Sequence, residues 1–125
     1  MRLASCIAAL ALFCGGAPAL ATSTIGCTVA DYPGMDLAMT VGHGVGAGIV
    51  QATISDGGEE ISTVNSGGAA IAQAWIDENT LKLDLVDANA ARYLVRLDTR
   101  RRGNAYVGTL LYRGRTWRVR CEEAS

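Results

Sequence analysis

Apolar and polar residues alternate along several short stretches of this chain. The clearest is Leu81–Leu85, where leucines at every second position are separated by charged residues. The same alternation occurs in Tyr93–Leu97 and Trp117–Cys121, and more weakly in Leu37–Val41. Successive side chains of a strand point to opposite faces, so alternation is typical of strands buried on one face. The pattern therefore predicts half-buried strands.

Turn-forming residues divide the chain between these runs. The signals are Asp56–Gly58, Asn65–Gly68, Asp77–Asn79, Ala88–Ala90, Arg102–Asn104 and Arg113–Gly114. The alanine-rich segment 69–76 also fits a helix, but Gly67 and Gly68 would fall in its first turn, so a strand is preferred. Short strands at this spacing predict an all-β fold, a small antiparallel meander of about 7–8 strands closing into a barrel or sandwich.

Tight turns would fix the pairing of the later strands. A two-residue turn at Arg113-Gly114 places Leu110 opposite Trp117 and Tyr106 opposite Cys121. By the same reasoning Leu85 lies opposite Tyr93 in the preceding hairpin. The residues that these registers place in the core are Leu81, Leu83, Leu85, Tyr93, Val95, Leu97, Leu110, Trp117 and Val119.

The first 21 residues have the pattern of a secretory signal peptide. Arg2 precedes an apolar run over 3–13, and small residues end at Ala21 in an A-x-A site. The run is shorter than the roughly 20 apolar residues that cross a bilayer, so no membrane span is expected. The sequence therefore predicts a cleaved segment 1–21, a single all-β domain over 22–125, and a periplasmic or extracellular location.

The predicted signal peptide removes two of the four cysteines, which leaves Cys27 and Cys121. An even pair in an oxidising compartment predicts a disulfide, here between the first and last strands. Two distant cysteines and the single histidine, His43, do not have the spacing of a zinc site. Neither a metal nor another cofactor is expected.

The glycine-rich segment Val41–Gly48, which contains His43, is the segment that most resembles a nucleotide-binding or catalytic loop. It lacks both the G-x-G-x-x-G spacing before a helix and the Lys-Ser/Thr of a P-loop. No nucleophile motif accompanies His43. We therefore do not expect an enzyme. The alternative is a minor hydrolase or a small-ligand carrier that uses His43 and a barrel pocket.

Charge is strongly segregated along the chain. Lys82 is the only basic residue from 22 to 91, whereas arginines gather from 92 to 120, where Asp98 is the only acidic residue. The sequence predicts a loop that holds Arg100, Arg101 and Arg102 and a last strand with two arginines on its outer face. The arginines predicted to form a binding face are these five, Arg100, Arg101, Arg102, Arg118 and Arg120. Guanidinium groups bind phosphate and carboxylate through paired hydrogen bonds, so this face predicts an anionic partner.

The favoured interpretation is a small, exported, non-catalytic binding module. Its partner would be an anionic envelope component or an acidic protein, and inhibition of an envelope-directed enzyme is one form of this function. The competing interpretation is that the arginines are solvated outer positions neutralised by the acidic half of the chain. The formal net charge of −1 and the few aromatic residues argue against a nucleic-acid partner. The sequence carries no signal for the oligomeric state.

Overall fold

The structure is a computed structural model, and it describes residues 22–42, 48–64 and 67–124. The predicted signal peptide and His43 lie outside the described residues. Within them no helix has the length and apolar character needed to cross a membrane.

Nine strands occur in the described residues, and all of them belong to one antiparallel sheet. They are β1 (Thr22–Val29), β2 (Met35–Gly42), β3 (Gly48–Asp56), β4 (Glu59–Ser62), β5 (Ala69–Ile76), β6 (Thr80–Asp87), β7 (Tyr93–Arg102), β8 (Ala105–Tyr112) and β9 (Arg115–Glu123). The all-β prediction is confirmed, and segment 69–76 is a strand rather than a helix.

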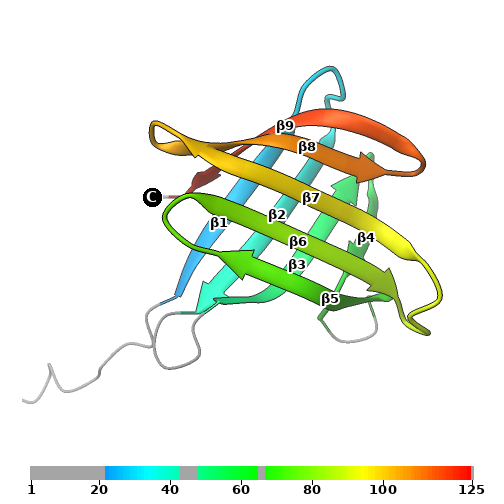
Figure 1. The fold of residues 1–125 in the computed structure, drawn as a ribbon. Helices are drawn as coiled ribbons and strands as arrows, with labels where there is room; N and C mark the ends of the chain where they lie inside the picture. The colour runs from blue at the N-terminus through cyan, green and yellow to red at the C-terminus, as the bar shows by residue number, and fades with distance from the viewer. Residues whose placement is uncertain (1–21, 43–47, 65–66, 125) are drawn as a thin grey trace, which may run out of the picture.

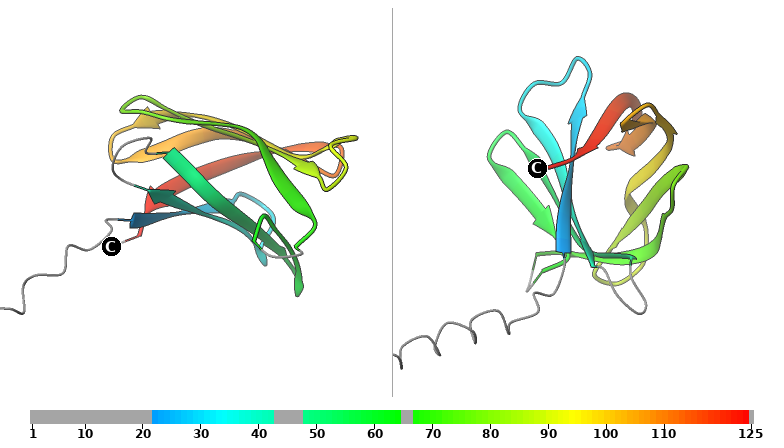
Figure 2. Two further views of the ribbon diagram at one scale, coloured as in Figure 1. Left: turned by 90° about the horizontal axis from the view of Figure 1, so that it is seen from below. Right: turned by 90° about the vertical axis from the view of Figure 1, so that its left-hand side faces the viewer.

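The sheet curls into a nearly closed barrel. Its strand order is β4-β3-β2-β1-β9-β8-β7-β6-β5, so every neighbour is also a sequence neighbour except the β1–β9 pair. Figures 1 and 2 show β6, β7 and β8 lying across from β1, β2 and β3. Ser62, at the end of β4, forms an isolated bridge with Gly68 just before β5, which brings the two ends of the sheet together.

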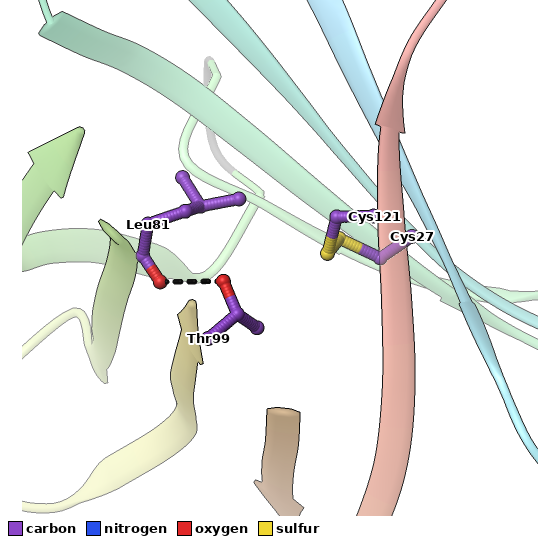
Figure 3. Close-up of a disulfide and its surroundings, with 4 residues drawn as sticks. All are labelled: Cys27, Leu81, Thr99 and Cys121. Carbon is purple, nitrogen blue, oxygen red and sulfur yellow. Dashed lines mark hydrogen bonds between the residues drawn. A yellow bond between two sulfur atoms is a disulfide. The ribbon is translucent and has the colours of Figure 1, made fainter. Parts of the chain in front are cut away.

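The first and last strands are joined by the predicted disulfide. Cys27 of β1 and Cys121 of β9 are direct partners in the antiparallel register, and their sulfur atoms are bonded (Figure 3). Both side chains are buried among the apolar residues of the barrel. Alternation puts both cysteines on the inner faces of their strands, so the bond forms inside the core.

Most of the predicted core is confirmed. The residues that are buried as predicted are Leu81, Leu83, Leu85, Val95, Leu97, Leu110 and Val119. Trp117 is partly buried and packs against this core. The β8–β9 pairing is also confirmed, with Leu110 opposite Trp117 and Tyr106 opposite Cys121. Positive φ angles of 52° at Arg113 and 77° at Gly114 fit the two-residue turn.

The prediction for Tyr93 was wrong, since this side chain is 53% exposed. The connection before β7 is longer than a tight turn, and Leu85 pairs with Val95 rather than with Tyr93. A bulge between Leu85 and Val86 then places Tyr93 opposite Val86, which breaks the alternation. The shifted register brings Thr99 opposite Leu81.

Thr99 follows Val95 and Leu97 on the inward face of β7, so it is a polar residue within the apolar interior, and the observed register places it opposite Leu81. Its side chain is 1% exposed, and its hydroxyl donates a hydrogen bond of 2.9 Å to the carbonyl oxygen of Leu81 (Figure 3). The bond satisfies the hydroxyl locally, which is the condition for burying such a group without a large penalty.

Gly108 marks a close approach between β7 and β8. A Cβ atom there would overlap the carbonyl oxygen of Asp98 and lie 2.8 Å from the Cα of Thr99. We expect Gly108→Ala to lower the free energy of unfolding by about 1–3 kcal/mol, because backbone rather than a flexible side chain must move. Urea denaturation measures this change.

Gly26→Ala is the matched control, because a Cβ at this exposed β1 position meets nothing within 4 Å. We expect its stability to stay within about 0.5 kcal/mol of the parent. Equal effects of the two substitutions would contradict the proposed close approach of β7 and β8.

Candidate functional site: an arginine-lined groove

Strand alternation places most of the predicted binding arginines on the outer face of the barrel. On β7, Arg100 and Arg102 are exposed and alternate with inward residues. On β9, Arg118 and Arg120 are exposed in the same way. Strand β8 lies between these two strands, and its Val107 is paired with both Arg100 and Arg120. Four of the five predicted arginines are thus neighbours on one surface.

Arg101 does not join this surface. Its Nε donates a 2.7 Å hydrogen bond to the carbonyl oxygen of Glu78, and its Nη2 donates one of 3.0 Å to the Tyr106 hydroxyl. The guanidinium also lies over the Tyr106 ring, 4.6 Å from its centre. The Tyr106 hydroxyl donates in turn to the carbonyl oxygen of Asp77. Arg101 therefore ties the β5–β6 turn to β8.

Beside the outer arginines the surface is hollowed. The hollow has a volume of about 530 Å³ and is lined by Thr28, Val29, Ala30, Arg102, Val107, Gly108, Arg118, Val119 and Arg120. We call this feature the arginine groove. Half-buried Val107 of β8 faces outward in it, flanked by the small residues Gly108 and Ala30. The groove therefore combines an apolar floor with long cationic side chains.

The basic residues elsewhere on the barrel mostly have carboxylate partners. The ion pairs are Lys82–Asp98, Arg92–Asp87, Arg96–Asp84, Arg113–Asp56 and Arg113–Glu59. The hydrogen bond to Asp84 raises the pKa of Arg96, and that to Glu59 raises the pKa of Arg113. The competing interpretation expects the acidic half of the chain to neutralise the basic half, and these ion pairs agree with it.

Three outer arginines depart from that rule. Within the described part of the chain, the side chains of Arg100, Arg102 and Arg118 make no ion pair, hydrogen bond or ring contact. Arg120 does have a partner, since its Nε lies 2.6 Å from a carboxylate oxygen of Glu122, but both side chains are about half exposed. The cationic charge at the groove is therefore only partly balanced by the protein itself.

A second polar cluster lies near the start of β9, and its members are far apart in the sequence. The Tyr32 hydroxyl lies 2.8 Å from both carboxylate oxygens of Asp56, and the Tyr112 hydroxyl donates to the same carboxylate at 3.1 Å. The hydrogen bond to Asp56 raises the pKa of Tyr32, whereas burial is the main cause of the raised pKa of Tyr112. The cluster joins the β1–β2 loop to β3 and β8.

Trp117 extends this cluster through ring contacts. Its ring centre lies 4.7 Å from that of Tyr32, and the Arg115 guanidinium lies 4.6 Å from the Trp117 ring centre. The indole Nε1 is buried and has no hydrogen-bond partner among the described residues. No pattern in the sequence predicts this cluster, because its members lie far apart along the chain. Its aromatic, acidic and basic members are engaged mainly with one another, so we interpret it as a structural contact.

The interior of the barrel is occupied by side chains. The largest of those that are almost completely buried include Leu37, Met39, Ile54, Leu81, Leu83, Leu85, Leu97 and Leu110. Among the described residues no three histidine, cysteine, aspartate or glutamate side chains gather as a metal-binding group.

Comparison with known proteins gives no further guide, since no family model, curated protein or solved structure matches this chain.

Proposed function

We propose that this protein is a small, exported, non-catalytic binding module that engages an anionic partner through the arginine groove. The observation that carries the proposal is a set of exposed arginines whose side chains have no partner in the described residues: Arg102 and Arg118 line the groove, and Arg100 lies on the same outer face of β7 as Arg102. Guanidinium groups close together on one face repel one another, and a bound anion relieves that repulsion. Anion binding is thus favoured at this face.

Export is part of the proposal. The disulfide supports it, because structural disulfides persist in oxidising compartments and are rare in the cytosol. The signal-like pattern of residues 1–21 supports it independently. The partner would accordingly be an anionic envelope component or an acidic protein, and an envelope-directed enzyme that is inhibited by docking belongs to the second group.

The alternative, a carrier or minor hydrolase, has less support. A carrier needs room inside the barrel, where buried leucines lie. The hydrolase hypothesis depends on His43, which is outside the described residues.

The proposal is tested by replacing Arg118 and Arg120 together with glutamine. We expect binding to anionic phosphatidylglycerol vesicles, to polyglutamate or to both to weaken at least about tenfold, and parent binding to fall as salt rises. Stability should change by less than about 1 kcal/mol, because exposed ion pairs contribute little. Binding titrations at two salt concentrations and urea denaturation supply the measurements.

A variant in which Arg92 and Arg96 become glutamine loses the same charge and serves as the control. Both of these arginines are paired with carboxylates, so we expect a loss of less than about threefold. Equal weakening in the two variants would show that net charge alone matters. That result, or the absence of binding by the parent to both probes, would overturn the proposal.

A further inference from the structure

The arginine groove presents two kinds of surface to a ligand. Its cationic groups come from Arg102, Arg118 and Arg120, whereas its floor is formed around half-buried Val107. The stems of arginine side chains are themselves apolar and can cover an apolar ligand while the guanidinium stays at the rim. A ligand that satisfies both surfaces has a compact anionic head and an apolar body.

The spacing of the arginines fits a phosphate group. Arg118 and Arg120 lie on the same face of β9 two residues apart, which separates their backbones by about 6.4–6.8 Å. Arg102 approaches from β7, on the other side of β8. Guanidinium forks bind the oxygens of one phosphate in pairs, and phosphate offers enough oxygens for more than one fork.

The floor of the groove discriminates against a polypeptide. Strand β8 pairs with β7 on one edge and with β9 on the other, and the Ala30 N–H already donates to the carbonyl oxygen of Arg118. The sheet backbone under the groove is therefore occupied. A peptide lying over Val107 would find no free sheet edge there, so it could not gain the backbone hydrogen bonds that usually hold an extended peptide on a sheet. An acyl chain has no such groups.

We infer that the arginine groove takes one molecule of an anionic lipid, with its phosphate between Arg118 and Arg120 and its chain against Val107. This inference rests on the proposed function and names the class of its ligand. The groove volume of about 530 Å³ lies within the range of small-molecule sites, roughly 300–1,000 Å³, and suits a headgroup with the beginning of a chain.

The test measures affinities of the full chain by calorimetry for four probes. These are inorganic phosphate, monomeric dihexanoyl phosphatidic acid, monomeric dihexanoyl phosphatidylcholine and a hexaglutamate peptide. We expect phosphatidic acid to bind at least tenfold more tightly than each of the others, because it alone combines an uncompensated phosphate with an apolar chain. Arg118→Gln should weaken binding of phosphatidic acid and of inorganic phosphate.

Val107→Ser separates the apolar contribution from the ionic one. We expect this substitution to lower the affinity for phosphatidic acid at least fivefold and to leave the affinity for inorganic phosphate unchanged. Leu111→Ser is the matched control, because Leu111 is an exposed, outward residue of the same strand that does not line the groove. Its affinity for phosphatidic acid should equal that of the parent.

Each other outcome overturns a defined part of the inference. Tighter, Arg118-dependent binding of hexaglutamate would refute the lipid assignment and leave the proposed function standing. Equal affinities for phosphatidic acid and phosphate, with no effect of Val107→Ser, would refute the apolar subsite. Binding to vesicles of phosphatidic acid but not to its monomer would refute a site for a single lipid. If the parent binds no anionic probe, or if Arg118→Gln leaves the affinity for every probe unchanged, both the inference and the proposed function are overturned.

Discussion

Replacing Cys27 and Cys121 together with alanine is expected to lower the free energy of unfolding by about 4–5 kcal/mol. The disulfide joins residues 94 positions apart, so it closes a loop of nearly all the described chain. In the chain-entropy account, a cross-link over a loop of about this size restricts the unfolded chain by about that amount. Urea denaturation of the parent and the variant under oxidising conditions measures the difference.

Reduction supplies the control for this experiment. A reductant should destabilise the parent strongly and leave the alanine variant unaffected, since the described residues contain no other cysteine. Comparing the reduced parent with the variant then isolates the loss of the two buried sulfur atoms from the loss of the bond. A reduced parent as stable as the oxidised one would contradict the stabilising role assigned to the disulfide.

Leu83→Ala is expected to cost about 2–5 kcal/mol, the range for a leucine removed from a well-packed core. Leu83 is 0% exposed and lies on β6, where it is paired with Leu97 of β7 on one side and Ala74 of β5 on the other. Partners on both sides limit how far the neighbouring strands can move to fill the space. Thermal and urea denaturation measure the change.

Leu111→Ala tests whether this cost depends on burial. Leu111 is 39% exposed on the outer face of β8, so its truncation should cost far less than that of Leu83. A Leu83→Ala cost below about 1 kcal/mol, or similar costs at both positions, would show that the inner and outer faces have been assigned incorrectly.

The alternation of apolar residues was sufficient to predict the later strands of the barrel and most of its core. It was not sufficient for Tyr93, because a register depends on the length of the connecting turn and on bulges. Neither is visible in a period-two pattern. The same shift placed Thr99 rather than an apolar side chain opposite Leu81. Its burial depends on a hydrogen bond to a backbone carbonyl, which a residue-by-residue pattern does not show.

The candidate site was predictable only in part. Segregation of charge identified the arginines of β7 and β9, but Arg101 was grouped with its neighbours although alternation alone separates it from Arg100 and Arg102. Its turn toward Tyr106 follows from the strand extending through residue 102 rather than ending in a loop. The place of Val107 in the groove could not be predicted from the sequence. It depends on the order of strands in the sheet, which puts β8 between the two arginine-bearing strands.

Because β1 pairs with β9, β1 cannot complete its pairing in the sheet until β9, the last of the described strands, has been synthesised. Local hairpins such as β8–β9 can form as soon as their own residues are available, whereas the seam between the two ends of the chain brings together residues of very large sequence separation. A polypeptide that stops short of Cys121 offers Cys27 no partner thiol within the described residues. Formation of the disulfide within one monomer therefore distinguishes chains that include Cys121 from chains that stop before it.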